Sequence, residues 1–377
     1  MKMKKKFLIG FLLIFASILS ACQSNWEVTV HGGDGTGGLI DKETVSFYIE
    51  KSQEEIETVQ LGQLFYDIGY TLIDEVSFIT ENQSAVTYTW DNIGETTMIS
   101  AAGEITLGDG TKLQPDEIGV TPSDLLSTIK YSIMDISPTV SEALGLPAFS
   151  ESAGQVIYKA EVEHAVLILL DGTQYQVLSD MANAGELPFF EENVNIQRGI
   201  TVYPSISTSG SAAFLTGLPP RENGVFGYGY RTTESKTLFD LAVQEGKSVV
   251  AVEGSSLPFN LRNAETILSG DRDGNGFSDD NVYENAMDVI QSGMPDLLYI
   301  HFHEIDDMGH TYGPDSSEYA FAIERVDQYL SGIYDALPQS VLIMIFADHG
   351  MHTTQEGGNH GALIADDLII PIVILEK

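Results

Sequence analysis

Three long apolar runs from residue 165 onward each lead into an aspartate. They are residues 165–170 before Asp171, residues 297–303 before Asp306 and residues 341–347 before Asp348. Continuous apolar runs of this length are typical of strands buried on both faces of a parallel sheet. Because the active sites of such sheets collect where the strands end, we expect the three aspartates to lie together at one edge of the sheet.

From residue 156 onward, apolar runs alternate with segments of helical periodicity. The predicted strands are 166–170, 195–201, 248–252, 296–303, 341–347 and 369–375. The predicted helices are 178–185, 211–215, 238–245, 281–292 and 316–336. This alternation predicts an α/β fold for residues 156–377, with a mostly parallel sheet flanked by helices.

Residues 41–155 have a different pattern, in which apolar and polar positions mostly alternate. A turn at residues 108–110 predicts a hairpin of residues 105–107 with 111–113, and residues 45–49 resemble a strand. Helices are predicted near 61–69, from Thr121-Pro122 and from Thr139 to Gly145. We interpret residues 41–155 as a small β-rich accessory domain that ends in helices.

The first 22 residues have the features of an export signal. Four lysines precede an apolar stretch, residues 7–19, that is too short to span a bilayer comfortably. Leu19-Ser20-Ala21-Cys22 then resembles a bacterial lipobox, in which Cys22 is lipidated and becomes the N-terminus. An ordinary secretory signal with an incidental cysteine is the alternative. The lipobox predicts an extracytoplasmic protein held on the membrane of a bacterium by a lipid anchor.

Residues 23–40 are rich in glycine and contain a formal G-x-G-x-x-G pattern. A dinucleotide site needs this pattern between a core strand and a helix. A strand-like segment, residues 45–49, follows it here. We therefore reject a dinucleotide site and predict that residues 23–40 are a linker.

The chain is strongly acidic. Its net charge is −37, and removal of the four signal lysines leaves 14 basic against 55 acidic residues, a net charge of −41. Such a surface repels nucleic acid at long range, so we expect no binding to nucleic acid polymers. A small phosphorylated substrate would need positive charge supplied by the site itself.

Histidines gather near the last two of the three aspartates, since six of the eight lie between residues 301 and 360. Asp306 and His310 are four residues apart, His349 follows Asp348, and His360 precedes a glycine. Mixed carboxylate and imidazole sets are typical of sites for zinc, manganese or iron. We interpret the remaining histidines of this region as supporting or packing residues; they are His301, His303 and His352.

A nucleophile is expected on a turn before a helix. Residues 203–211 form such a turn, and residues 212–217 read as a short helix and its stop. The free N–H groups at a helix N-terminus bind phosphate oxygens, and a metal lowers the pKa of a serine hydroxyl. Ser207 is our candidate nucleophile, with Thr208 as the alternative. The non-catalytic interpretation is that this segment is only a serine-rich loop.

Taken in order, these segments resemble the motifs of the alkaline phosphatase superfamily, most closely its type I phosphodiesterase/nucleotide pyrophosphatase branch. The motifs are Asp171-Gly172, Ser207 nine residues before Thr216-Gly217, Asp306-x-x-Gly309-His310, Asp348-His349-Gly350-Met351 and His360-Gly361. The resemblance covers residues 160–377 and implies an alkaline-phosphatase-like fold. It also implies that Asp306, His310 and His360 hold one divalent metal, and that Asp171, Asp348 and His349 hold another. Ser207 would be the nucleophile between them.

The chain departs from that branch in three places. The branch usually has threonine as nucleophile, its His-Gly-Ile segment is Asn223-Gly224-Val225 here, and its phosphate-binding asparagine is replaced near Tyr228. These departures leave the choice between phosphodiester and phosphomonoester substrates open. A sulfatase is not expected, because its C/S-x-P-x-R pattern is missing at Ser207.

An acidic segment matches the first nine positions of a calcium loop. The predicted ligands are Asp271, Asp273, Asn275 and Asp279. The twelfth position is Val282 rather than glutamate, so an EF-hand is not expected. A plain acidic turn is the alternative to a solitary calcium site.

Together these features predict a membrane-anchored phosphohydrolase with two divalent metals, zinc before manganese or iron. Its substrate would be a small phosphodiester or nucleotide pyrophosphate, cleaved through a phosphoseryl intermediate. A phosphomonoesterase, a phosphoryl-group transferase acting on lipid or cell-wall precursors, and a non-catalytic metal-binding surface lipoprotein are the alternatives.

Overall fold

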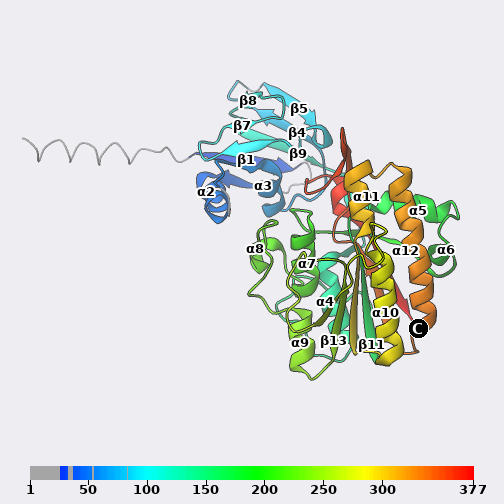
Figure 1. The fold of residues 1–377 in the computed structure, drawn as a ribbon. Coiled ribbons are helices and arrows are strands. Elements are labelled where there is room, and N and C mark those ends of the chain that lie inside the picture. Colours follow the sequence, from blue (N-terminus) through cyan, green and yellow to red (C-terminus); the bar gives the residue numbers. More distant parts are fainter. Residues whose placement is uncertain (1–25, 33–36, 53–54, 83) are drawn as a thin grey trace, which may run out of the picture.

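The computed structural model describes residues 26–377, apart from 33–36, 53–54 and 83. The predicted signal segment and Cys22 therefore lie outside the described residues. The described chain forms a large α/β unit with a smaller β-rich unit against one end of it (Figure 1). Within the described part of the chain, no helix is both long enough and apolar enough to cross a membrane.

The large unit is built on an eight-stranded sheet. In spatial order its strands are β10 (Tyr131–Ser132), β12 (Gln197–Ile200), β19 (Ile369–Glu376), β16 (Val341–Phe346), β11 (His164–Leu170), β15 (Leu297–Phe302), β13 (Val249–Glu253) and β14 (Glu265–Leu268). Only β19 runs antiparallel to its neighbours in this sheet. The predicted α/β class with a mostly parallel sheet is therefore confirmed.

Helices cover both faces of this sheet, which explains why its strands are apolar throughout. Alternate residues of β11 point to opposite faces: Leu167 packs into one core and Ile168 into the other. The first core is closed by α4 (Ile136–Ala143), α7 (Ser207–Thr216) and α9 (Leu238–Gln244). The second is closed by α5 (Tyr175–Asn183), α6 (Pro188–Asn193), α10 (Asp279–Gly293) and α12 (Ser317–Ala336).

The β-rich unit contains two smaller sheets. One has the order β2 (Gly37–Asp41), β1 (Glu27–Gly32), β9 (Glu117–Pro122), β4 (Ile73–Ile79), β5 (Ala85–Thr89). The other has the order β3 (Thr58–Gln60), β6 (Met98–Ser100), β7 (Ile105–Thr106), β8 (Lys112–Leu113). The predicted hairpin is present as β7 and β8, and the predicted helix near 61–69 is α3 (Leu61–Asp67).

Several local predictions for this unit were wrong. The predicted linker contains β1 and β2, which pair with each other; β1 also pairs with β9, so residues 27–32 and 37–41 belong to the sheet. Residues 45–49 are part of helix α2 (Lys42–Lys51), because Asp41 caps its N-terminus by accepting from the Thr44 N–H at 2.8 Å. Thr121-Pro122 ends a strand instead of opening a helix. The helix predicted from Thr139 is present as α4, but it begins at Ile136, so Thr139 lies inside it.

The boundary between the two units also lies earlier than residue 155. Strand β10 and helix α4 belong to the large unit, because β10 extends the eight-stranded sheet and Ile136 packs in its core. The two units share apolar contacts: Leu363 and Leu368 of the large unit pack in the core of the β-rich unit. The indole N–H of buried Trp90 donates to the carbonyl of Leu363 at 2.7 Å.

Candidate metal centre and active site

The three aspartates come together at one edge of the eight-stranded sheet. Asp171 follows β11, and Asp348 follows β16 after one residue. Asp306 lies in helix α11 (Glu304–Tyr312), which begins just after β15. Since β11 lies between β15 and β16 and is parallel to both, the ends of these strands are neighbours. The parallel register therefore brings three distant segments to one place.

Asp171, Asp348 and His349 form the first candidate metal-binding group. The Nε2 atom of His349 lies 3.3 Å from Oδ1 of Asp171 and 3.7 Å from Oδ2 of Asp348. All three side chains are buried. This is the set of residues that the sequence assigned to one metal.

Asp306, His310 and His360 also lie together, and His349 reaches this second group as well. Nε2 of His310 is 3.4 Å from Oδ2 of Asp306 and 3.1 Å from Nε2 of His360. Nε2 of His360 is 3.8 Å from Oδ1 of Asp306. Asp306, His349 and His360 form a candidate metal-binding group of their own. The His349 and His360 rings stack with centroids 3.7 Å apart, so the two groups are in direct contact.

Backbone carbonyls orient the three imidazoles. Nδ1 of His349 lies 2.9 Å from the Gly350 carbonyl, Nδ1 of His360 lies 3.0 Å from that of Ser205, and Nδ1 of His310 lies 3.2 Å from that of Gly358. A carbonyl only accepts hydrogen bonds, so each Nδ1 carries the proton. In the neutral imidazoles, each Nε2 then has a free lone pair on the side of the aspartates, which is the usual arrangement around a metal.

The carboxylates have buried oxygens that no group of the described chain satisfies. Oδ1 of Asp171, Oδ1 of Asp306 and Oδ2 of Asp348 have no hydrogen-bond partner. Unpaired buried oxygens of this kind are costly unless something else, such as a cation, contacts them. These residues therefore fit divalent metals.

The same crowding shifts the ionisation of the group. Burial and the nearby Asp171 carboxylate raise the pKa of Asp348 to about 6. Burial and the same neighbour raise the pKa of Asp306 well above its usual range. Burial lowers the pKa of His360 to about 2, so this imidazole is neutral and able to coordinate. Cations bound between the carboxylates would relieve their mutual repulsion.

Ser207 stands at the first position of α7, with its hydroxyl directed at the histidines. Its Oγ lies 3.3 Å from Nε2 of His349. Thr208 faces away, because it is buried and its hydroxyl donates to the Gly227 carbonyl at 3.2 Å. Of the two predicted nucleophiles, only Ser207 is placed at the cluster. The first N–H groups of α7 have no partner within the helix, which suits an anion.

Two glycines permit the close packing around the cluster. Gly172 has a φ of +65°, and a Cβ there would lie 2.5 Å from Oδ1 of Asp306. A Cβ at Gly309 in α11 would lie 2.2 Å from the sulfur of Met351. Side chains at these positions would displace the segments that carry the aspartates.

A pocket of about 570 Å³ opens beside the cluster, between the β-rich unit and the large unit. Tyr48 of the β-rich unit and Phe226 and Tyr228 of the large unit contribute to its wall. The hydroxyl of Tyr228 lies 3.5 Å from Nε2 of His360, which connects the pocket to the metal-binding groups. No sequence pattern indicated this pocket, because its walls combine residues far apart in the chain, such as Tyr48 and Phe226.

Sequence reasoning missed Glu253, which is buried at the end of β13 and contacts both His301 and His303. The signal was available, since Glu253 follows the apolar run 249–252 as Asp171 follows its own run. His301 and His303 also contact Asp171.

His352 is a supporting residue as predicted: its Nδ1 lies 2.8 Å from Asp367, whose other oxygen accepts from the Ala362 N–H.

The residues of the predicted calcium loop make other contacts in this structure, and calcium binding stays a prediction. Asp279 is fully buried and accepts from the N–H groups of His303 and Glu304 at 3.0 and 2.9 Å, where it caps α11. Asp271 instead accepts from backbone N–H groups of its own exposed turn. The candidate metal groups among the described residues include none of the four predicted calcium ligands. The acidic segment is a turn followed by a helix cap.

Comparison with known proteins identifies the large unit. The family model described as type I phosphodiesterase/nucleotide pyrophosphatase matches residues 165–253 and 255–371, which is more than half of the chain. The chain belongs to this family. Ser207 and all six predicted metal ligands lie within the matched residues, whereas residues 26–164 lie outside them.

Relatives of this phosphodiesterase-family chain include hydrolases and transferases. The catalytic subunit of human GPI ethanolamine phosphate transferase 3 is 31% identical over 103 residues, which are 27% of this chain and 8% of that protein. An uncharacterized pyrophosphatase/phosphodiesterase of Schizosaccharomyces pombe is 24% identical over 219 residues, covering 51% of this chain and 45% of that protein. The chain thus matches less than half of each relative.

Solved structures show a weaker likeness. Phosphonoacetate hydrolase from Sinorhizobium meliloti 1021, in complex with phosphonoacetate, has a TM-score of 0.40 at 20% identity, over 50% of this chain and 56% of that one. Murine ectonucleotide pyrophosphatase/phosphodiesterase 5, in complex with AMP, has a TM-score of 0.41 at 15% identity, over 52% and 59%. Both TM-scores are below 0.5, so family membership depends on the family model alone.

Proposed function

We propose that this chain is a two-metal phosphohydrolase that cleaves phosphodiesters or nucleotide pyrophosphates. One observation carries the proposal: His349 lies in both candidate metal-binding groups, and its Nε2 is 3.3 Å from the Ser207 hydroxyl. A nucleophile beside two adjacent metal groups is the arrangement that phosphoryl transfer requires. Membership in the phosphodiesterase family supports the same reaction class.

We assign Asp171, Asp348 and His349 to one divalent metal, and Asp306, His310 and His360 to the other. Three oxygens and three imidazole nitrogens favour zinc, with manganese or iron as alternatives. When bound, such ions lower the pKa of a nearby hydroxyl and stabilise charge on phosphoryl oxygens. Gly350, Ser205 and Gly358 hold the imidazoles in the orientation that this binding needs.

Ser207 acts as the nucleophile in this proposal. Its oxygen forms a bond to phosphorus as the bond from phosphorus to the departing oxygen breaks, and the hydroxyl proton leaves to solvent or to the departing oxygen. Water then attacks phosphorus, the bond to Ser207 breaks, and the serine hydroxyl takes back a proton. Meanwhile the N–H groups that begin α7 bind non-bridging phosphoryl oxygens. The departing group lies toward the pocket beside Tyr228.

Hydrolysis of bis-p-nitrophenyl phosphate tests the proposal. The purified chain, treated with chelator and then dialysed, is expected to be inactive and to regain turnover when zinc or manganese is added. Asp348→Ala is expected to abolish the recovery of turnover, because it removes one of the three ligands assigned to the first metal. Full recovery of turnover in Asp348→Ala would overturn the assignment. A parallel assay with p-nitrophenyl phosphate decides between diester and monoester substrates.

A phosphoryl-group transferase is the second candidate, because a GPI ethanolamine phosphate transferase is 31% identical over 103 residues. The chemistry at Ser207 would be the same until an alcohol, instead of water, accepts the phosphoryl group. Product analysis in the presence of a high concentration of a simple alcohol separates the two. A transferase gives mainly the alkyl phosphate ester, and a hydrolase gives mainly the product of water attack.

We also propose that the chain is exported and lipidated at Cys22, on the outer face of a bacterial membrane. The support is the sequence alone, in which the basic and apolar segments precede Leu19-Ser20-Ala21-Cys22. Cells grown with labelled palmitate are expected to label the parent chain but not Cys22→Ala. Equal labelling of both chains would contradict the proposal.

A further inference from the structure

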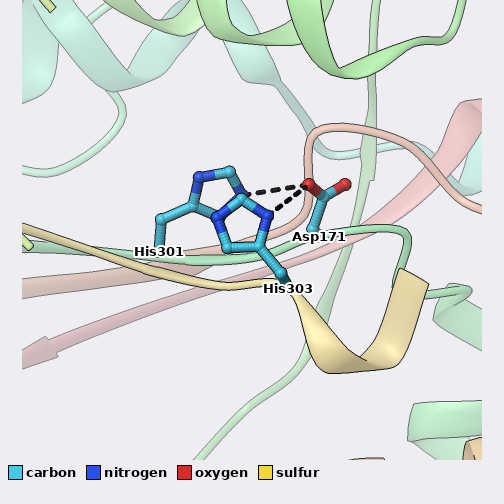
Figure 2. Close-up of side chains that lie close together, drawn as sticks. All are labelled: Asp171, His301 and His303. Carbon is cyan, nitrogen blue, oxygen red and sulfur yellow. Dashed lines mark hydrogen bonds and ion pairs between the residues drawn. The ribbon is translucent and has the colours of Figure 1, made fainter. Parts of the chain in front are cut away.

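A third group of side chains that could bind a metal lies next to the two groups of the proposed function. It consists of Asp171, His301 and His303, with Glu253 behind the two imidazoles. Figure 2 shows both rings directed at one oxygen of the Asp171 carboxylate. The family relationship does not account for Glu253 or the two histidines, and neither does the mechanism above.

Glu253 orients both rings. Its Oε2 atom lies 3.0 Å from Nδ1 of His301 and 3.0 Å from Nε2 of His303. In the neutral tautomer of each ring, this nitrogen donates to the carboxylate, and the other ring nitrogen has a lone pair that is free to bind a metal. Those other nitrogens are Nε2 of His301 and Nδ1 of His303, which are the two that face Asp171. A carboxylate that fixes histidines from behind is the usual second partner of metal-bound imidazoles.

The spacing of the three facing atoms suits a small divalent ion. Oδ2 of Asp171 lies 3.0 Å from Nε2 of His301 and 3.6 Å from Nδ1 of His303. Ligand atoms bound at zinc's usual length of about 2.0 Å in a tetrahedron are about 3.3 Å apart, midway between these values. The two rings lie with centroids 3.7 Å apart and are tilted by 31°, and one ligand atom from each of the three residues lies within 4.8 Å of the other two.

Charge and burial favour a cation here. Asp171 and Glu253 are 3% and 1% exposed, and His301 is fully buried. Within the described residues, every ion pair of these two carboxylates is with a histidine; none is with lysine or arginine. Two buried carboxylates without a permanent positive partner need another source of charge. The Asp171 oxygen on this side is Oδ2, whereas Oδ1 faces His349 in the first group.

We propose that Asp171 Oδ2, His301 Nε2 and His303 Nδ1 form a third divalent-metal site, with Glu253 as the positioning residue for both imidazoles. A nitrogen-rich set of this kind selects zinc over magnesium or calcium. His303 is partly exposed, so the fourth position of the ion opens toward water. A Cβ at Gly254 would lie 2.8 Å from Cδ2 of His303, so glycine at this position leaves room for the ring. The site depends on the proposed function only in sharing Asp171.

Metal counting tests this site independently of catalysis. The purified chain is stripped with chelator, reloaded with zinc, dialysed and analysed by inductively coupled plasma mass spectrometry. Three zinc ions per chain are expected for the parent and two for His303→Gln, which removes a partly exposed ligand. Ser207→Ala serves as the matched control and is expected to keep three. Glu253→Gln is expected to weaken the third ion about 10- to 100-fold in a zinc titration, because its ligands lose their orientation.

Two results would overturn the third site: two zinc ions per chain in both the parent and His303→Gln, or three in both. The first result means that His301 and His303 only position Asp171. Cobalt loading gives a second readout, since loss of one tetrahedral ion lowers the visible absorption of His303→Gln relative to the parent. Failure of the proposed function would give a different result: the parent chain would bind three zinc ions but would not hydrolyse the diester.

Discussion

The hydroxyl of Ser207 lies 3.3 Å from Nε2 of His349, although 142 residues separate them in the sequence. Ser207 lies at the start of helix α7, which packs on one face of the sheet. His349 lies two residues beyond Ala347, just after the end of strand β16. A Cβ on Gly210, one turn into α7, would lie 2.7 Å from Cβ of Asp348, so the helix and the strand end are in contact. This contact places the nucleophile beside the metal-binding groups.

Replacing the two neighbouring hydroxyl residues separates their roles. Ser207→Ala is expected to lower kcat by about 10³-fold to 10⁶-fold, because it removes the attacking oxygen. Thr208→Val keeps the shape but loses the bond to the Gly227 carbonyl, so it is expected to cost about 1 kcal/mol of stability and leave most turnover. Diester turnover and chemical denaturation measure both effects. The reverse pattern, with Thr208→Val inactive and Ser207→Ala active, would exchange their roles.

The β-rich unit supports the loop that carries His360. Trp90 donates to the carbonyl of Leu363, three residues beyond that histidine, at 2.7 Å. Trp90→Phe leaves this buried carbonyl unpaired and is expected to cost about 1–3 kcal/mol and to weaken metal retention during dialysis. Trp26→Phe is the matched control, because Trp26 donates to Ala101 within the β-rich unit. Equal metal loss in both variants would show that the contact with Leu363 is not responsible.

Gly309 allows α11 to pack against Met351. Gly309→Ala places a methyl group 2.2 Å from the Met351 sulfur and is expected to destabilise the fold by about 1–3 kcal/mol, despite the better helix propensity of alanine. Most of this cost should vanish in a Met351→Ala background, where the sulfur is absent. A double-mutant cycle in urea measures the difference. Additive effects of the two substitutions would place the strain elsewhere.

Asp296 makes stability depend on pH far from the metal cluster. Burial would raise its pKa, but hydrogen bonds from the N–H and hydroxyl of Ser248 and the ion pair with Lys247 outweigh burial and lower it to about 2. A carboxyl whose pKa is lower in the folded state stabilises the fold above its unfolded value, near 4, and loses that contribution as the pH falls toward 2. Asp296→Asn is expected to reduce the stability difference between pH 5 and pH 2.5. Denaturant midpoints at the two pH values measure it; an unchanged difference would contradict the assignment.

Strand ends and motif spacing were enough to predict the candidate site. Asp171, Asp306 and Asp348 follow apolar runs, and such runs become neighbouring parallel strands whose ends meet. The structure brings all six predicted ligand residues together, and their role as ligands stays a prediction. Glu253 was missed because an acidic residue after one apolar run is a weak signal when no histidine lies near it in the sequence. Only its contacts with His301 and His303 distinguish it.

Local errors arose where tertiary pairing outweighed composition. Glycine-rich residues 37–41 form a strand because β1 supplies a partner, and propensity alone does not predict that partner. Residues 45–49 contain β-branched and aromatic residues, yet the Asp41 cap and the burial of Val45 and Tyr48, three residues apart on one helix face, select a helix. Calcium binding by the acidic loop stays a prediction; the structure adds that Asp279 caps the N-terminus of α11.

The sequence by itself determined the chemistry that this chain can carry: an α/β sheet whose strand ends present carboxylates, imidazoles and a serine. The atoms that a side chain can offer to a metal or to phosphorus are properties of that residue alone. The apolar content of a strand predicts whether the strand is buried. Only the tertiary structure decided that Ser207 faces His349 while Thr208 faces Gly227, and that His349 belongs to both metal groups. It also decided that Trp90 supports the loop of His360 and that His301 and His303 converge on Asp171. Those relationships depend on the rotation of helices and on contacts between segments far apart in the chain, which no local pattern specifies.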